Sequence, residues 1–241
     1  MAVRLHKPKV IPIKNDDHWK ELRRKTVGAS ESAALFESVS NESPIPENEN
    51  EDFDYEENGE PVSPYTSPLA LWALKTGRIT ALNKPNDRIR WGTLLEPIIA
   101  EKIADKNGWQ LRRPKGYYIH PTIPEMGATL DFEVDIDGSG VFLPFEIKAV
   151  ADSERWKWHN AVGEWVVPGH IMIQVQHQLA VTGLPRAIIG VLFGGHEERI
   201  FNVPRDDALI AEIEAAVQDF WRYVLADEPP QVNIERDTWV I

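Results

Sequence analysis

The 241-residue sequence contains no cysteine, and this absence excludes several kinds of chemistry. Disulfides, zinc ribbons, iron–sulfur clusters and cysteine nucleophiles all require a thiol. No apolar run approaches the ~18 residues that a membrane-spanning helix needs, and the first nine residues lack the apolar segment of a signal peptide. There is also no glycine-rich phosphate loop, which argues against a nucleoside triphosphatase. We therefore expect a cytosolic protein without a membrane anchor.

Basic residues are scarce relative to acidic ones, and the net charge of −12 argues against nonspecific nucleic-acid binding by the whole surface. Residues 41–62 hold nine acidic residues and no basic one, so the remainder carries only −12 + 9 = −3. Such a block is typical of a solvated loop. We interpret it as an insertion that either shields a site from DNA or serves a partner, within a single domain spanning residues 1–241.

Hydrophobic periodicity and capping residues predict alternating helices and strands. The helices are expected at 19–36 with a break at Gly28, and at 67–77, 91–107, 170–182 and 206–225. Ser30 is expected to cap the second half of the first helix. The strands are expected at 116–120, 128–136, 141–150, 186–193 and 198–203. This order predicts an α/β fold with a mixed β-sheet and helices on both faces.

Residues 131–148 have the pattern of a hairpin that brings two carboxylates and a lysine together. Gly138-Ser139 is typical of a two-residue type II′ turn. With that turn at the centre, paired residue numbers sum to 277, so Asp131 faces Glu146. Because side chains alternate along a strand, Lys148 lies on the same face as Glu146.

Two like charges opposite each other on a sheet are unfavourable unless a cation lies between them. Carboxylates that leave room for water and phosphate suit Mg²⁺ or Mn²⁺ better than Zn²⁺. Lys148 could position an attacking water, and Glu96 could add a third carboxylate from a helix that Gly92 allows to approach closely. The alternative is a solvated acidic edge beside an ordinary surface glutamate.

Two further segments carry unusual side chains. Gln174 and Gln178 lie four residues apart on one predicted helix face, where they could bond water, metal ligands or phosphate, or form an exposed polar face. Three tryptophans fall in the connection before this helix, at positions 156, 158 and 165. They could stack on unpaired bases, but a subunit contact is slightly favoured.

Several motifs occur in an order that is typical of one family. They are Trp19-x-x-x-Arg23, Gly28-Ala-Ser30-Glu31, Trp72 with Lys75-Thr-Gly77, Trp91-Gly92-x-x-x-Glu96, Asp131, Glu146-x-Lys148 and Gln174-Val-Gln176-His177-Gln178. Over most of its length the chain thus resembles the phage lambda exonuclease-like (YqaJ-type) viral recombinases of the PD-(D/E)xK nuclease superfamily. The resemblance implies a restriction-endonuclease-like sheet. The sequence differs from the usual family pattern at Phe132, where a small residue is usual, at Glu31, where aspartate is common, and in the acidic block.

The resemblance also implies roles for individual residues. Asp131, Glu146 and the main-chain carbonyl of Ile147 would bind Mg²⁺, with Mn²⁺ as a substitute and two ions expected per site. Lys148 would be the catalytic lysine. Glu96 would lie near the second metal or the attacking water, and Gln174 would support the site.

Contacts with the DNA end are expected from a second group of residues. Arg23 and Ser30 match positions that would hold a 5′-phosphate, in agreement with the affinity of an arginine and a helix N-terminus for phosphate; a surface arginine and a structural cap are the alternatives. Gln176 belongs to the same predicted DNA-binding group. Arg88 and Arg90 form a basic patch around Ile89, a candidate apolar wedge that would split the duplex.

The residues themselves support metal-dependent phosphodiester hydrolysis. The resemblance adds a 5′-to-3′ exonuclease that acts on ends of linear double-stranded DNA and leaves 3′ overhangs for recombination by strand annealing. It also implies a ring-shaped homotrimer, a single-strand annealing protein as partner, and a phage or prophage gene. The alternatives are an endonuclease or nickase of the same fold, and a catalytically silent DNA-binding or assembly protein.

Overall fold

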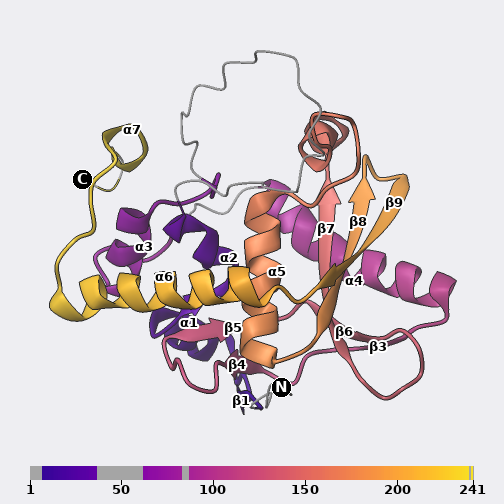
Figure 1. Ribbon diagram of the computed structural model, residues 1–241, viewed down its shortest axis with the longest axis horizontal. Helices are drawn as coiled ribbons and strands as arrows, with labels where there is room; N and C mark the ends of the chain where they lie inside the picture. Colours follow the sequence, from indigo (N-terminus) through magenta and orange to yellow (C-terminus); the bar gives the residue numbers. More distant parts are fainter. Residues whose placement is uncertain (1–6, 37–61, 83–86, 239, 241) are drawn as a thin grey trace.

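The structure of the protein is a computed structural model that describes residues 7–36, 62–82, 87–238 and 240 (Figure 1). Of the predicted acidic loop, only Val62 lies within the described residues. The α-helices are α1 (Asp16–Arg24), α2 (Ala29–Ser32), α3 (Pro68–Lys75), α4 (Asp87–Asn107), α5 (Gly169–Thr182), α6 (Asp207–Ala226) and α7 (Ile234–Asp237). Two 3₁₀ helices, η1 (Ala33–Leu35) and η2 (Asp152–Trp158), accompany them.

The strands form two sheets. The larger sheet has the order β3 (Gln110–Arg112), β6 (Phe132–Asp135), β7 (Leu143–Val150), β8 (Arg186–Phe193), β9 (Glu197–Pro204). In it β7 and β8 run parallel, and the other neighbours are antiparallel. The smaller sheet has the order β1 (Lys9–Ile11), β4 (Tyr117–Ile119), β5 (Met126–Ala128), β2 (Val27–Gly28).

Alternation along β7 and β8 gives the larger sheet two buried faces. Phe145 and Ile188 pack with Ile103 of α4 on one face. Ile189 and Val191 belong to the core that α5 and α6 complete on the other face. In Figure 1, α4 passes behind the larger sheet, while α5 stands between β5 and β7. The predicted mixed sheet with helices on both faces is confirmed.

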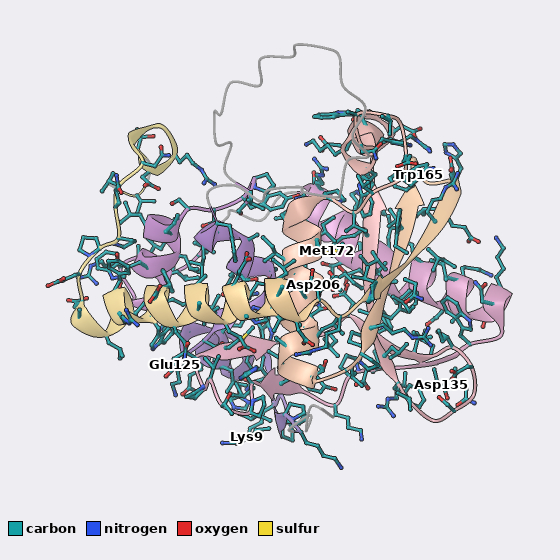
Figure 2. All side chains as sticks on the ribbon, viewed as in Figure 1. Lys9, Glu125, Asp135, Trp165, Met172 and Asp206 are labelled. Carbon is teal, nitrogen blue, oxygen red and sulfur yellow. The ribbon has the colours of Figure 1, made fainter. Side chains whose placement is uncertain are left out.

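The register of the predicted hairpin is confirmed, but its turn is wrong. Phe132 pairs with Phe145 and Val134 with Leu143, and both pairs sum to 277. The connection is the longer segment 136–142, because the buried Asp135 carboxylate accepts hydrogen bonds from the main chain of Gly138 (2.9 Å) and Gly140 (2.8 Å). Asp135 and Trp165 mark opposite ends of the larger sheet (Figure 2). Compared with the predicted two-residue turn, the loop gains two residues before it and three after it, and the pairs within β6 and β7 keep the predicted register.

Two other predicted boundaries differ from those of the structure. The strand predicted at 128–136 is divided into β5 and β6, which belong to different sheets. Helix α4 begins at Asp87 rather than Trp91. Helix α5 ends where Gly183 adopts a left-handed conformation with φ of 71°, as predicted. No described helix combines the length and apolar character needed to cross a membrane.

Packing between α4 and the larger sheet predicts opposite effects of one substitution at two glycines. A Cβ at Gly190 would lie 2.7 Å from Ile103 Cδ1 and 2.9 Å from the Phe145 ring, whereas a Cβ at Gly92 would meet nothing within 4 Å. Gly190→Ala should lower the free energy of unfolding by about 1–3 kcal/mol through overpacking. Gly92→Ala should leave it unchanged or raise it by up to about 1 kcal/mol. Urea denaturation measures both, and equal effects would contradict the packing described.

Candidate active site

Glu146 of β7 lies at the centre of a cluster of polar side chains. It is only 2% exposed, and three side chains donate to its carboxylate. Lys148 Nζ (2.5 Å) and Gln174 Nε2 (2.6 Å) reach Oε1, and Gln178 Nε2 (2.7 Å) reaches Oε2. A buried carboxylate without such donors would be very costly, so the site is built as a unit from β7 and α5.

Asp131 immediately precedes β6, at the position where the ladder register places it opposite Glu146. Its Oδ2 accepts a hydrogen bond from the main-chain N–H of Ile147 at 2.9 Å. The pKa of Asp131 is raised well above its ordinary value, first by the loss of solvent around it and then by the negative charge of Glu146. The two predicted metal carboxylates are therefore brought together and repel each other.

Lys148 supplies the positive charge of the cluster. Its Nζ donates to Glu146 and, at 3.3 Å, to Gln174 Oε1. Burial disfavours the charged ammonium, but the carboxylates of Glu146 and Asp131 outweigh this effect and raise the pKa of Lys148. The ammonium therefore stays protonated and held against the carboxylates.

Glu96 approaches the cluster from α4. Its carboxyl is half-buried, and burial followed by the charge of Glu146 raises its pKa. The helix thus brings a third carboxylate within electrostatic reach of Glu146, as predicted. The reason given for Gly92 is wrong, because open space surrounds that glycine and no close approach occurs there.

The donor atoms of this cluster suit a hard divalent cation. Among the described residues, no three His, Asp or Glu side chains converge closely enough to enclose a metal by themselves. Mg²⁺ does not require this, because it is commonly held by one or two carboxylates and keeps water and phosphate as its other ligands. Asp131 and Glu146, which raise the electrostatic cost of each other's charge, fit such an ion.

Two glutamines of α5, Gln176 and Gln178, have different contacts, and those of Gln176 differ from its predicted role. Gln176 is 1% exposed, donates to the main-chain carbonyl of Pro204 (2.8 Å) and accepts from the N–H of Asp206 (2.9 Å). Its carboxamide joins β9 to the start of α6, so the predicted contact of Gln176 with DNA is wrong. Gln178 instead bonds Glu146, and its spacing of four residues from Gln174 already indicated a shared face.

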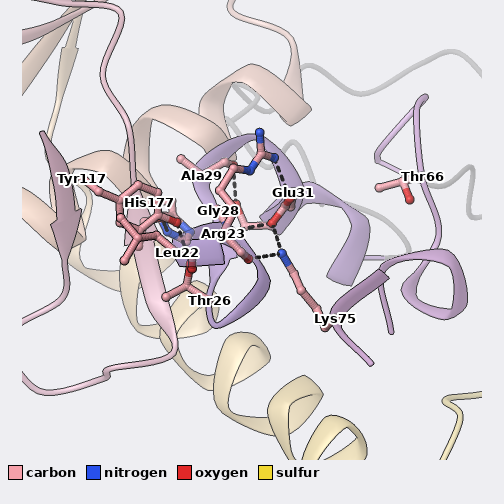
Figure 3. Close-up of polar contacts among 12 residues, drawn as sticks. Leu22, Arg23, Thr26, Gly28, Ala29, Glu31, Thr66, Lys75, Tyr117 and His177 are labelled. Carbon is pink, nitrogen blue, oxygen red and sulfur yellow. Dashed lines mark hydrogen bonds and ion pairs between the residues drawn. The ribbon is translucent and has the colours of Figure 1, made fainter. Parts of the chain in front are cut away.

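The predicted phosphate-binding residues lie on α1 and α2, beside a buried ion cluster (Figure 3). Arg23 Nη2 donates to Glu31 Oε1 at 2.5 Å, and Lys75 Nζ donates to Glu31 Oε2 at 2.6 Å. Ser30 is exposed, but it lies inside α2, whose N-cap is Gly28, so its predicted capping role is wrong. The sequence pattern does not predict the contribution of Lys75.

The basic patch lies at the exposed start of α4. Arg88 approaches Glu154 at 3.9 Å and Arg90 approaches Asp87 at 3.6 Å, and both guanidinium groups remain mostly in solvent. Ile89 between them is also exposed. This placement leaves the patch accessible to a large ligand, and the wedge role of Ile89 stays a prediction.

The three tryptophans before α5 have different environments. Trp158 is buried against Phe193, and Trp165 packs against the same ring. Only Trp156 of this group is strongly exposed, with Lys157 Nζ 5.5 Å from its ring centroid. Trp158 is therefore a core residue and Trp165 is partly buried against the core, which leaves Trp156 as the most exposed of the three for a base or a subunit contact.

Comparisons with known proteins identify the family and the fold of the chain. The sequence model of a protein family, the YqaJ-like viral recombinase domain, matches residues 59–185, just over half of the chain. The uncharacterized protein YqaJ of Bacillus subtilis (strain 168) is 26% identical over 220 residues, which cover 90% of this chain and 59% of that protein. The chain therefore spans less than two thirds of the length of this relative.

Solved structures share the fold. The alkaline exonuclease LHK-Exo from Laribacter hongkongensis superposes with a TM-score of 0.59 at 22% identity, over 88% of this chain and 94% of that one. Its complex with dAMP gives a TM-score of 0.61 with the same identity and coverage. These likenesses establish a shared fold with an exonuclease.

The raised pKa of Asp131 predicts how stability depends on pH without divalent metal. The folded protein holds this proton more tightly than the unfolded chain does, so stability is lost as pH rises from the ordinary aspartate range through the raised pKa. Asp131→Asn removes this loss and can still accept from Ile147. Its stability advantage over wild type, measured by urea unfolding in EDTA, should be larger at about pH 8 than at about pH 4. An advantage that shrinks with rising pH would contradict the carboxylate repulsion.

Proposed function

Because the chain belongs to the YqaJ-like viral recombinase family, we propose that it is a metal-dependent nuclease that hydrolyses DNA. The observation that carries the proposal is the convergence of Asp131, Glu146 and Lys148 on one face of the larger sheet, with Glu96 approaching from α4. Metal-assisted hydrolysis of a phosphodiester requires carboxylates, a positive charge and a group that orients water. This cluster contains all three kinds of group.

The residues of the cluster would have separate roles in metal binding and in hydrolysis. Asp131, Glu146 and the carbonyl of Ile147 would hold Mg²⁺, or Mn²⁺ in its place, and two ions per site are expected with Glu96 near the second. When bound, the metal polarises the scissile phosphate and lowers the pKa of a coordinated water. Lys148 would orient the attacking water and offset negative charge as it develops.

Two glutamines of α5, Gln174 and Gln178, would hold the catalytic side chains in position. Gln174 contacts both Glu146 and Lys148, so it fixes the two side chains relative to each other. Gln178 holds the second oxygen of Glu146. Catalytic groups need to be held within a fraction of an ångström, and these neutral donors do so without cancelling the carboxylate charge.

We further propose that the enzyme is an exonuclease that acts on the 5′ ends of linear double-stranded DNA and leaves 3′ single strands. The shared fold with the alkaline exonuclease LHK-Exo supports exonuclease action. Arg23 and Ser30 would receive the 5′-phosphate, while Arg88, Arg90 and Ile89 would meet the duplex where it opens. The family's description as viral recombinases supports a phage or prophage origin, with activity in the host cytosol.

We also propose that the protein works as an oligomer with a partner protein. The family resemblance favours a ring-shaped homotrimer around the DNA, and a single-strand annealing protein that takes over the 3′ strand. In a ring, the acidic residues could lie outside while basic residues line the channel, so a net charge of −12 is compatible with DNA binding.

Nuclease assays with substituted lysines test the proposal. Wild type with Mg²⁺ should degrade a linear duplex, and Lys148→Ala should lower the rate by at least about 100-fold because the positive charge that orients water and offsets developing negative charge is lost. Lys102→Ala is the matched control, since Lys102 is an exposed lysine of α4 without a predicted role. A label on the 5′ end should be released before a label on the 3′ end.

A plasmid, tested both in linear form and as a covalently closed circle, separates the alternatives. An exonuclease leaves the circle intact while it degrades the linear form. Cleavage of the circle would indicate an endonuclease or nickase. No hydrolysis by wild type, with DNA still bound, would indicate a silent binding protein and refute the catalytic assignment.

A further inference from the structure

The ion cluster around Glu31 is separate from the candidate site at Asp131 and Glu146. Glu31 is buried, and its two oxygens accept from three donors: Arg23 Nη2 (2.5 Å), Lys75 Nζ (2.6 Å) and the N–H of Gly28 (2.8 Å). Figure 3 shows these groups converging from α1, β2, α2 and α3. With both oxygens satisfied, Glu31 is ionised, and its pKa is lowered to about 2 because Lys75 and Arg23 together outweigh the cost of burial.

Lys75 connects to Arg23 twice. Its side chain is 0% exposed, and its Nζ donates both to Glu31 and to the main-chain carbonyl of Arg23 at 2.8 Å. Lys75 thus fixes the backbone of Arg23 directly and the guanidinium of Arg23 through Glu31. A completely buried lysine is rare, because burial of a charge is costly without compensation.

The cluster does not balance its own charge. Two cations, Arg23 and Lys75, share one anion, Glu31, which leaves +2 − 1 = +1. No other carboxylate pairs with either cation among the described residues. The guanidinium of Arg23 is 28% exposed, and of its nitrogens only Nη2 donates to a described residue. Stacking of Arg23 over Trp19, at 4.7 Å from the ring centroid, further fixes its plane.

We propose that Lys75 sets the charge of an anion site at Arg23. Lys75 neutralises Glu31, so the charge of Arg23 remains available to a terminal phosphate of the DNA end, while Glu31 holds the guanidinium in place. Without Lys75, the Arg23–Glu31 pair would be neutral and would attract a phosphate weakly. This inference rests on the proposed function and adds Glu31 and Lys75 to it as positioning residues that touch no DNA.

Binding of DNA ends in EDTA tests this role without any hydrolysis. The measured quantity is the ratio of Kd for a duplex with 5′-hydroxyl ends to Kd for the same duplex with 5′-phosphate ends, from fluorescence anisotropy. Lys75→Gln keeps hydrogen-bonding groups and removes the charge, and Lys75→Met removes both. Each should lower this ratio about tenfold relative to wild type. Lys25→Met, which alters an exposed lysine paired with Glu21, should leave it unchanged.

The double variant Glu31→Gln with Lys75→Met separates charge from structure. It restores a net charge of +1 on Arg23, so it should regain part of the preference for 5′-phosphate that Lys75→Met loses. Replacing both members of a buried ion pair is usually tolerated, so this variant is expected to fold even where a single variant fails. Glu31→Asp, which keeps the charge, should retain the preference.

Three results would overturn the inference. They are a wild-type protein that binds both ends equally, Lys75 variants that keep the wild-type ratio, and a double variant whose ratio is no higher than that of Lys75→Met. Because the assay requires no cleavage, absence of nuclease activity would count against the proposed function and not against the anion site.

Discussion

The structure depends most on the need to neutralise one buried carboxylate. Glu146 lies in the middle of the larger sheet, and an unpaired charge there would cost several kcal/mol. Lys148 comes from the same strand, but the two glutamine donors come from α5. Their hydrogen bonds fix how α5 packs on β7, and the repulsion by Asp131 leaves the cluster suited to a divalent cation. Stability and chemistry thus place opposite demands on the same few side chains.

Helix α5 extends this arrangement across the molecule, because its polar residues point in several directions. Gln174 and Gln178 face β7, the buried His177 bonds the main chain of Gly127 in β5, and Gln176 bonds the start of α6. In Figure 2, Met172 of α5 and Asp206 lie close to the crossing of α5 and α6. The helix therefore links both sheets, and it also packs against α2, which carries the buried Glu31.

The sequence predicted what depends on local pattern and failed where distant contacts decide. The alternation of side chains and a hairpin centred on residues 138 and 139 predicted the register of Asp131 and Glu146. They did not predict the loop that the Asp135 carboxylate organises. A helical spacing of four residues grouped Gln174 with Gln178, yet only the packing of α6 shows that Gln176 is buried. Lys75 was unpredictable as a partner of Glu31 because 44 residues separate them and no periodicity relates two such segments.

The central claim is that Asp131 and Glu146 form the metal-binding part of a nuclease site. Crystals of the protein soaked with Mn²⁺, in place of Mg²⁺, test it most directly through the anomalous scattering of the metal. We expect an anomalous peak about 2 Å from a carboxylate oxygen of both residues. It should be absent in Asp131→Asn crystals. A wild-type structure with Mn²⁺ bound elsewhere, or with no peak between these carboxylates, would contradict the claim.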